Sequence, residues 1–286
     1  MISGFGCRGL AAPHVKNSNM PPTNVRLIEV DGRAFRTRIK LGEKPPLLII
    51  NGIGANLELL EPLTEALGGV ETIVFELPGM GETPMSLFPY RMRHLARSIA
   101  RMLDVLGYSG QVDVLGVSWG GALAQQFAFT CPRRCRKLIL VATTPGVLMV
   151  PGSLFAMASL LNPRRYTDPS HLERIAPRVY GGAARSDGSL IREYARRSKS
   201  PHWLGYLYQQ MAFWGWTSLP WLPLLPQPTL ILSGKDDPLV PVINGRILAA
   251  LIPRARLELV DDGHLFLLTN PLQIVPTIRD FLATVA

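Results

Sequence analysis

The chain alternates short apolar segments with helix-forming segments, and this alternation limits the possible folds more than any other feature. The apolar segments are rich in Leu, Ile and Val and end at Gly, Pro or polar turns. Parallel strands that are buried on both faces have this composition. We therefore predict an α/β fold in which a mostly parallel central sheet is flanked by helices. The predicted strands are residues 47–51, 72–76, 112–116 and 137–142, and the predicted helices are residues 57–67, 90–106 and 120–129.

The alternation stops after Thr144 and resumes near residue 228. The segment between these points holds four of the five tryptophans, many arginines and helical stretches broken by Pro and Gly. We predict that residues 145–226 form a helical cap inserted into a core of residues 24–144 and 227–286. The second part of the core is predicted to contain strands at 228–234 and 257–260 and helices at 243–251 and 272–284.

A β-hairpin is predicted ahead of the first buried strand. Residues 25–30 and 33–40 alternate around Asp31-Gly32, a dipeptide that favours a tight turn. Residues 1–23 are rich in Gly, Asn and Pro and show no periodicity, so we predict a flexible N-terminal extension there.

The composition is that of a globular protein. With 286 residues, 47% hydrophobic and 18% charged, the chain can bury a large core. Its cysteines, Cys7, Cys131 and Cys135, are an odd and sparse set, which favours a reducing compartment. Because neither a membrane-spanning run nor a signal-peptide pattern is present, we predict a soluble cytoplasmic protein without a transmembrane segment. The net charge of +9 comes mainly from scattered arginines without a nucleic-acid-binding motif, which predicts a solvated basic surface and no nucleic-acid partner.

Ser118 lies at a turn between a predicted strand and a predicted helix. The segment Gly116-Val117-Ser118-Trp119-Gly120 fits G-x-S-x-G, which in this setting is typical of the nucleophile elbow of serine hydrolases. Glycines avoid side-chain collisions in so sharp a turn, and the bend exposes the hydroxyl above the strand ends. We therefore predict that Ser118 is a nucleophile.

A serine nucleophile needs a base within hydrogen-bonding distance, and His264 is the candidate. It directly follows the predicted strand at 257–260. Active residues of parallel sheets sit at the carboxyl ends of strands. The other histidines lie in the N-terminal extension, on a predicted helix or in the predicted cap: His14, His94, His171 and His202.

The base in turn needs a carboxylate that fixes its tautomer, and we assign this role to Asp237. Asp236 competes with it, but Pro238 restricts Asp237 to an extended backbone that aims its side chain consistently. Asp261 and Asp262 are interpreted as turn formers. The order Ser118, Asp237, His264 is that of the α/β-hydrolase fold.

Backbone N–H groups close to Ser118 are predicted to hold the oxyanion of the reaction. Trp119 offers one at the start of a helix, and Ile53 offers another in the turn after the strand at 47–51. The glycines on either side of Ile53 could also simply form a tight loop between a strand and a helix, and this interpretation would be preferred if Ser118 were absent. Asn51, in the same turn, is a candidate for substrate binding.

These residues predict acyl transfer without a metal or a cofactor. No His, Asp and Glu residues have metal-ligand spacing, and neither a P-loop nor a dinucleotide fingerprint is present. In the predicted reaction Ser118 attacks an ester carbonyl, and His264 moves the proton to the leaving alcohol. Water then hydrolyses the acyl-enzyme.

Several longer segments resemble the intracellular depolymerases of medium-chain-length poly(3-hydroxyalkanoates). The resemblance extends from about Leu27 to about Leu282, and the family matches Ser118, Asp237 and His264 as its triad. The family also has Asn-Gly where many relatives have His-Gly before the oxyanion residue. The segments that carry the resemblance are residues 51–56, 116–127, 162–166, 215–218 and 261–267.

The resemblance implies hydrolysis of a storage polyester at granule surfaces inside the cell, with release of 3-hydroxy acids or short oligomers. Trp214 and Trp216 in the predicted cap are candidate contacts for this apolar substrate, although aromatic residues of a small cap usually form its own core. Two alternatives stay open. One is a general carboxylesterase or carbon–carbon bond hydrolase acting on small apolar substrates, and the other is a granule-associated protein without catalysis. The oligomeric state does not follow from the sequence.

Overall fold

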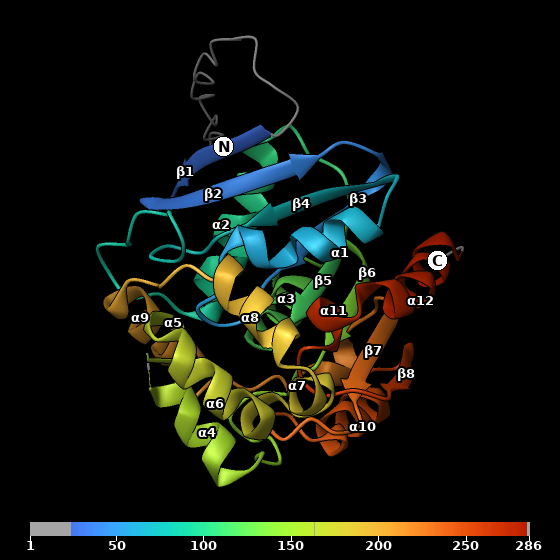
Figure 1. The fold of residues 1–286 in the computed structure, drawn as a ribbon. Helices are drawn as coiled ribbons and strands as arrows, with labels where there is room; N and C mark the ends of the chain where they lie inside the picture. Colours follow the sequence, from blue (N-terminus) through green and yellow to red (C-terminus); the bar gives the residue numbers. More distant parts are fainter. Residues whose placement is uncertain (1–23, 163, 285–286) are drawn as a thin grey trace, which may run out of the picture.

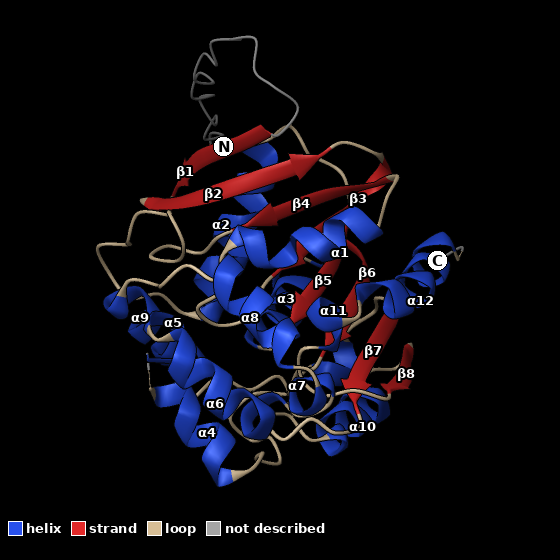
Figure 2. Ribbon diagram, in the orientation of Figure 1, coloured by secondary structure: helices blue, strands red, loops and turns tan. Residues whose placement is uncertain are grey.

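A computed structural model of the chain describes residues 24–162 and 164–284. The flexible extension predicted for residues 1–23 lies outside the described residues. One sheet of eight strands, in the order β1-β2-β4-β3-β5-β6-β7-β8, forms the centre of the fold (Figures 1 and 2). The strands are β1 (Asn24–Val30), β2 (Arg33–Lys40), β3 (Glu43–Ile50), β4 (Val70–Phe75), β5 (Val112–Val117), β6 (Cys135–Val141), β7 (Thr229–Gly234) and β8 (Ala255–Val260).

The sheet is mostly parallel, as predicted. β3 to β8 pair in parallel, whereas β2 runs antiparallel to both β1 and β4. The predicted hairpin is confirmed, because Val30 pairs with Arg33 across a turn in which Asp31 and Gly32 both have positive φ. Two residues with positive φ are what a tight hairpin turn requires.

Helices cover both faces of the sheet. On β3, Leu48 and Ile50 pack into the cluster that contains the apolar side chains of α2 and α3, whereas Leu47 and Ile49 pack into the cluster of α1 and α12. Neighbouring residues of a strand point to opposite faces, so a strand covered on both sides reads as a continuous apolar run. The core helices are η1 (Leu57–Leu60), α1 (Glu61–Ala66), α2 (Met92–Val105), α3 (Trp119–Thr130), η2 (Pro132–Arg134), α10 (Val242–Leu251), α11 (Phe266–Thr269) and α12 (Pro271–Ala283).

The helix predicted at residues 57–67 is divided into η1 and α1. Pro62 has no N–H group and fits the first turn of an α-helix without loss of a hydrogen bond, and the α-helix begins at Glu61. The preceding turn is a 3₁₀-helix.

The helices between β6 and β7 lie together near the carboxyl ends of the parallel strands (Figure 1). Helix α6 contacts α4, α5, α7 and α8, and its apolar side chains form a cluster of their own with those of α8. The predicted boundaries of the cap at residues 145 and 226 stay predictions. The elements of this cap are α4 (Leu154–Leu161), α5 (Arg164–Thr167), α6 (Pro169–Tyr180), α7 (Ala183–Ser186), α8 (Gly188–Arg197), α9 (Trp203–Phe213) and η3 (Leu222–Leu224).

Within residues 24–162 and 164–284, no helix combines the length and the apolar character that crossing a lipid bilayer would need.

Candidate active site

Ser118 occupies the sharp turn between β5 and α3. Its backbone angles, φ 54° and ψ −118°, are unfavourable for a residue with a side chain and therefore must be held by the surroundings. The Ser118 amide donates to the carbonyl of Val141 (2.8 Å), and its carbonyl accepts from the hydroxyl of Thr143 (2.6 Å). Both partners lie at the end of the neighbouring strand β6, which fixes the turn from outside.

The glycines around Ser118 are required by close backbone approaches. A β-carbon at Gly116 would collide with the carbonyl of Gly120, which matches the predicted crowding within the turn. A β-carbon at Gly120 would collide with the carbonyl oxygens of Ile50 and Asn51, at the end of β3. Gly120 therefore lets α3 begin directly against the strand that leads into the Ile53 turn.

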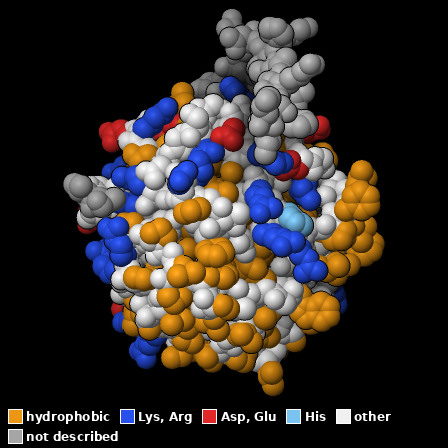
Figure 3. All heavy atoms as spheres, turned by 180° about the vertical axis from the view of Figure 1, so that it is seen from behind, with side chains coloured by type: hydrophobic (Ala, Val, Ile, Leu, Met, Phe, Trp, Pro, Cys, Tyr) orange, Lys and Arg blue, Asp and Glu red, His pale blue; other side chains and the backbone are white. Residues whose placement is uncertain are grey.

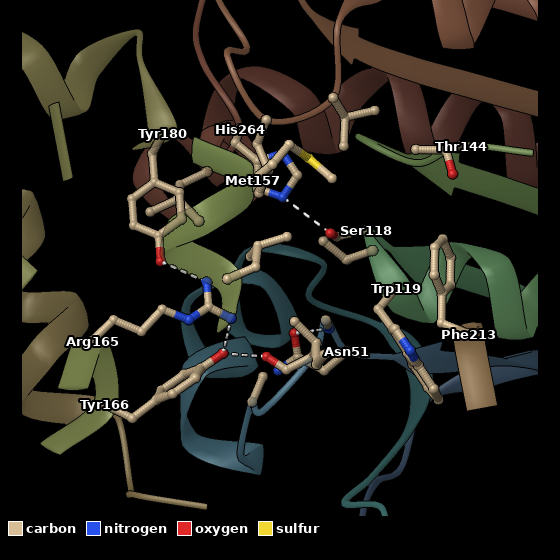
Figure 4. A pocket seen from close by; sticks show the side chains of 18 of the residues that line it. Asn51, Ser118, Trp119, Thr144, Met157, Arg165, Tyr166, Tyr180, Phe213 and His264 are labelled. Atoms are coloured by element: carbon tan, nitrogen blue, oxygen red, sulfur yellow. Dashed lines mark hydrogen bonds between the residues drawn. The ribbon is translucent and has the colours of Figure 1, made fainter. Parts of the chain in front are cut away.

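The structure brings Ser118, His264 and Asp237 together. His264 Nε2 lies 3.1 Å from Ser118 Oγ, and His264 Nδ1 lies 2.7 Å from Asp237 Oδ2 (Figure 4 shows the first of these contacts). The other carboxylate oxygen, Asp237 Oδ1, accepts from the amides of Leu239 (2.9 Å) and Val240 (2.8 Å). Because a carboxylate can only accept a hydrogen bond, His264 Nδ1 carries the proton and donates the hydrogen bond to Asp237. His264 Nε2 is then unprotonated and can accept the proton of Ser118.

Asp236, the competing acid, faces away from His264. Its carboxylate accepts from the amide of Gly182 (2.8 Å) and pairs with Arg185 (2.7 Å), both in the cap. Asp262 bonds the amides of Gly263 (2.6 Å) and Ala183 (2.7 Å), in agreement with its interpretation as a turn former. The geometry therefore selects Asp237 as the partner of the histidine.

The Ile53 turn and the start of α3 lie on either side of the Ser118 hydroxyl. A β-carbon at Gly52 would be 3.7 Å from Ser118 Cβ, so this turn packs directly on the serine. Trp119 is the first residue of α3, where an amide has no acceptor within the helix. Ile53 and Trp119 both line the same cavity as Ser118. Both residues thus lie in the cavity that contains the serine, and their role as an oxyanion hole stays a proposal.

Side chains from the core and from the cap hold the Ile53 turn in place. Asn51 accepts from the Gly52 amide (2.8 Å) and donates to the Asn56 carbonyl (3.1 Å). From the cap, the Gln209 side chain accepts from the Gly54 amide (2.7 Å) and the Tyr166 hydroxyl donates to the Ile53 carbonyl. Asn51 lines the cavity, but its polar atoms bond its own turn, so its place fits bracing of the turn better than the predicted contact with substrate.

A cavity of about 490 Å³ lies over Ser118 between the core and the cap. Its walls are mainly aliphatic and aromatic, with α4 contributing the side chains of Leu154, Met157, Leu160 and Leu161. Figure 4 shows some of the polar residues of the lining: Ser118 and His264 lie on one side, and Arg165, Tyr166 and Tyr180 lie on the other. Such a lining suits an apolar ligand that presents one reactive polar group.

The comparisons with known proteins agree with this geometry. Residues 45–271 match the family described as the alpha/beta hydrolase fold. The chain is 51% identical to the poly(3-hydroxyalkanoate) depolymerase of Ectopseudomonas oleovorans over 91% of its own length and 93% of that protein. The chain belongs to the poly(3-hydroxyalkanoate) depolymerase family of the α/β-hydrolase fold.

Solved structures with lower sequence identity support the fold alone. The enol-lactonase of Burkholderia xenovorans LB400 has a TM-score of 0.78 at 21% identity and covers 91% of this chain and 100% of its own. A thermophilic esterase of Thermogutta terrifontis has a TM-score of 0.75 at 24% identity and covers 90% of this chain and 96% of its own. The structure places the segments 51–56, 116–127 and 261–267, on which the resemblance to the depolymerase family rests, around the serine and the histidine.

The structure does not bring the two cap tryptophans that are predicted to contact the substrate of this depolymerase family member into the catalytic cavity. Neither Trp214 nor Trp216 lines the cavity. Trp216 donates through Nε1 to Gln126 (2.8 Å) and packs against Phe213 and Trp221 at the junction of cap and core. Trp214 directly follows α9 and is 82% exposed. Their predicted role in substrate binding rests on the aromatic composition of the cap, and composition does not tell on which face a side chain lies.

Sequence reasoning missed the polar cluster on the cap side of the cavity. Arg165 and Tyr166 belong to a segment that resembles the depolymerase family, but no role was assigned to either residue. Their signal is weak because a buried arginine and a surface arginine look alike in a sequence with 30 Lys and Arg residues. Only the burial of Arg165 distinguishes it from its exposed neighbour Arg164.

Among the described residues, no group of three or more His, Cys, Asp or Glu side chains is arranged to hold a metal ion.

Proposed function

We propose that this protein hydrolyses ester bonds of poly(3-hydroxyalkanoate) through a serine acyl-enzyme. The observation that carries the proposal is the hydrogen-bonded series Ser118–His264–Asp237 at the base of an apolar cavity. The substrate class is supported by the 51% identity to a poly(3-hydroxyalkanoate) depolymerase.

The geometry supplies each step of the reaction. His264 Nε2 accepts the Ser118 proton as Oγ attacks the ester carbonyl, and the amides of Ile53 and Trp119 stabilise the negative oxygen that forms. His264 then protonates the leaving alkoxide, and the ester C–O bond breaks. In the second half of the reaction, His264 takes a proton from a water molecule as that water attacks the acyl-enzyme. His264 then gives the proton to Ser118 Oγ, and the bond between Oγ and the acyl carbon breaks. Each oxyanion donor in such a site contributes about 3 kcal/mol to the transition state.

We further propose a preference for monomers with medium-length side chains. The cavity walls from α4 are aliphatic, and each methylene group buried against them contributes about 0.8 kcal/mol of binding. Short side chains leave part of this surface in contact with water. A longer side chain therefore gains affinity until the 490 Å³ cavity is filled.

Attachment to the polyester granule is proposed to use an exposed apolar stripe on α9. Three of its members follow one another at intervals of one helical turn on α9, are 64%, 43% and 45% exposed and so share one face: Trp203, Leu207 and Met211. Trp214, which is 82% exposed and directly follows the helix, is the fourth member. Gln210 and Phe213 of the same segment line the cavity, so the stripe lies next to the site of cleavage. Apolar side chains also extend over the lower half of the face seen in Figure 3.

This attachment places the protein in the cytoplasm, where storage granules lie. Cys131 and Cys135 are free thiols, which suits a reducing compartment. An exposed apolar stripe lowers solubility for a monomer but favours adsorption to a hydrophobic particle.

The proposed activity is tested by incubating the protein with polyester particles made from medium-chain and from short-chain monomers and analysing the products. We expect release of 3-hydroxy acids or short oligomers, faster from medium-chain particles. Ser118→Ala abolishes release while Ser109→Ala, an exposed serine in the α2–β5 loop, leaves it unchanged. Cleavage of small soluble esters without any cleavage of particles would instead identify a general esterase. A protein that adsorbs to particles but cleaves neither substrate would be a non-catalytic granule protein.

A further inference from the structure

Arg165 is a buried charge in the catalytic cavity, and it has no acidic partner among the residues that the structure describes. It lies in α5 on the cap side, is 4% exposed and lines the cavity together with Ser118. Among residues 24–162 and 164–284, no Asp, Glu or Lys lines the cavity. Across the described residues, no carboxylate lies within ion-pair distance of the Arg165 guanidinium. Burying an unpaired charge is costly, so such a residue requires an explanation.

Tyrosine hydroxyls hold the guanidinium but do not neutralise it. Arg165 Nη2 donates to the hydroxyls of Tyr166 (2.6 Å) and Tyr206 (3.0 Å), and Nη1 donates to that of Tyr180 at 3.5 Å, near the limit of a hydrogen bond. Burial raises the pKa values of Tyr166 and Tyr206, so both hydroxyls are neutral at physiological pH. The ring centroids of Tyr166 and Tyr206 lie 4.5 and 5.8 Å from the guanidinium carbon and the rings partly stabilise the charge, but no anion among the described residues neutralises it.

The guanidinium also has unused hydrogen-bonding capacity. Within the described part of the chain, the five N–H groups of Arg165 make three hydrogen bonds, and the one from Nη1 is long. Nε also has no acceptor there but is fully buried, so a ligand would approach the guanidinium at Nη1. The Tyr166 and Tyr206 hydroxyls donate onward, to the carbonyls of Ile53 and Leu160. These tyrosines fix the guanidinium in one orientation. An arginine held in this way matches a carboxylate or phosphate group, which can accept more than one of its N–H groups.

Arg165 is connected by hydrogen bonds to the turn that packs on Ser118. Its Nη2 bonds the Tyr166 hydroxyl, which in turn bonds the carbonyl of Ile53, the residue whose amide is proposed to hold the oxyanion. Figure 4 shows this series of contacts reaching from the cap across the cavity wall opposite Ser118. A group bound by Arg165 thus belongs to the part of the substrate next to the cleaved ester.

We propose that Arg165 binds the free carboxylate at the carboxyl end of a polyester chain and thereby directs cleavage to that end. This inference rests on the proposed function. A poly(3-hydroxyalkanoate) chain has one hydroxyl end and one carboxyl end, and only the carboxyl end is anionic. Bound in this orientation, the terminal unit or units are the leaving group. Ser118 Oγ bonds the acyl carbon, the ester C–O bond breaks, and His264 gives its proton to the leaving oxygen. The released acid keeps its carboxylate on Arg165, and water then frees the rest of the chain from Ser118.

The experiment compares two soluble substrates that differ only in this charge. One is the linear two-unit ester of 3-hydroxyoctanoic acid with a free carboxylate, and the other is the same molecule with a primary carboxamide at that position. We expect kcat/KM for the internal ester to be about 10- to 100-fold higher for the acid, the range for a hydrogen bond to a charged group. Arg165→Met brings the ratio close to one. The matched control Arg164→Gln, which removes an exposed arginine one position earlier, keeps the wild-type ratio.

Several outcomes would overturn the inference. If the wild-type protein cleaves the acid and the amide equally fast, the inference is wrong. This measurement needs no variant, so it is decisive even if Arg165→Met does not fold. Retention of the full ratio in a folded Arg165→Met protein overturns the inference as well, and would leave Arg165 as a purely structural residue. Inhibition of 4-nitrophenyl octanoate hydrolysis provides a second measurement on the wild type. 3-Hydroxyoctanoate should inhibit at concentrations about 10-fold or more below those needed with 3-hydroxyoctanamide, and equal inhibition contradicts the carboxylate site.

Failure of this inference and failure of the proposed function look different. A protein that degrades polyester particles but shows no acid-to-amide ratio lacks the carboxylate site and keeps the proposed function. A protein that shows the ratio on the two-unit ester but leaves particles intact keeps the carboxylate site and contradicts the proposed function.

Discussion

The core side and the cap side of the catalytic cavity hold their polar groups in different ways. On the core side, Asp237 and His264 follow strands directly, and the acid bonds both the histidine and backbone amides. On the cap side, Arg165 lies among tyrosines without an opposite charge. The core side carries the chemistry of ester cleavage, and the cap side supplies apolar surface and one charge. This difference indicates that the reaction is set by loops of the core and the choice of substrate by the cap.

The largest effect is expected from the acid of the core side. Asp237→Asn should lower kcat for 4-nitrophenyl octanoate by about 10⁴-fold, because an amide no longer holds His264 in the tautomer that accepts the serine proton. Asp236→Asn is the matched control. It breaks only an ion pair between half-exposed side chains and should change kcat by less than about threefold. A larger loss in Asp236→Asn than in Asp237→Asn would reverse the assignment of the acid.

Glycines of the two regions should differ in how much they contribute to stability. Gly120→Ala introduces a β-carbon that collides with the carbonyls of Ile50 and Asn51, and we expect a loss of about 3 kcal/mol in the free energy of unfolding. In the cap, Gly215 has φ +75° but open space around it. Gly215→Ala should therefore cost only about 1 kcal/mol, from its left-handed backbone. Urea unfolding of both variants measures the two values, and equal losses would mean that the turn below Ser118 can relax.

The core site could be predicted from the sequence because local rules determine it. Ser118, Asp237 and His264 each directly follow an apolar strand, and parallel strands bring their carboxyl ends to one edge. The cap could not be predicted to the same depth. Its helices are short and irregular, so periodicity does not tell which side of α9 faces the cavity. The sequence therefore names Trp214 as a substrate contact without telling that it lies on the surface, and it gives no sign of Arg165 because burial has no local signature.

A smaller effect is expected where core and cap meet, at Glu58. Its carboxylate accepts from Asn56 (2.6 Å), from Arg36 of β2 (3.1 Å) and from Lys199 of the cap (3.2 Å). Burial alone would raise the pKa of Glu58, but the hydrogen bond from Asn56 and the contacts with Arg36 outweigh it and lower the pKa from 4.5 to about 2. Because the folded state favours the ionised form, the stabilisation is present above pH 4.5 and is lost as the pH falls toward 2.

Glu58→Gln tests this contribution through its pH dependence. At pH 7 we expect the free energy of unfolding of the variant to be about 1 to 2 kcal/mol lower than that of the wild type. This loss is smaller than the lowered pKa of Glu58 would give for a fully buried group, because the side chain is partly solvated. The difference between the two proteins should shrink between pH 5 and pH 3. The same measurements on Glu29→Gln, at an exposed position of β1, serve as the matched control. A Glu58→Gln difference that stays constant over this range would contradict the account.

The smallest effect concerns the outer surface of the cap, on the stripe of α9. Trp214→Ser removes the most exposed side chain of the stripe, so it should leave the free energy of unfolding within about 0.5 kcal/mol of the wild type. Adsorption to polyester particles should weaken about threefold, because the variant lacks the indole that contacts the particle. Leu41→Ser is the control, since Leu41 is 75% exposed in the β2–β3 turn, away from α9 in Figure 1. If Leu41→Ser weakens adsorption as much as Trp214→Ser, the protein binds particles through general surface hydrophobicity. If only Trp214→Ser weakens adsorption, the segment of α9 and Trp214 contacts the polymer surface with its exposed side chains and the cavity with Gln210 and Phe213. Adsorption then brings a chain end to the entrance of the site.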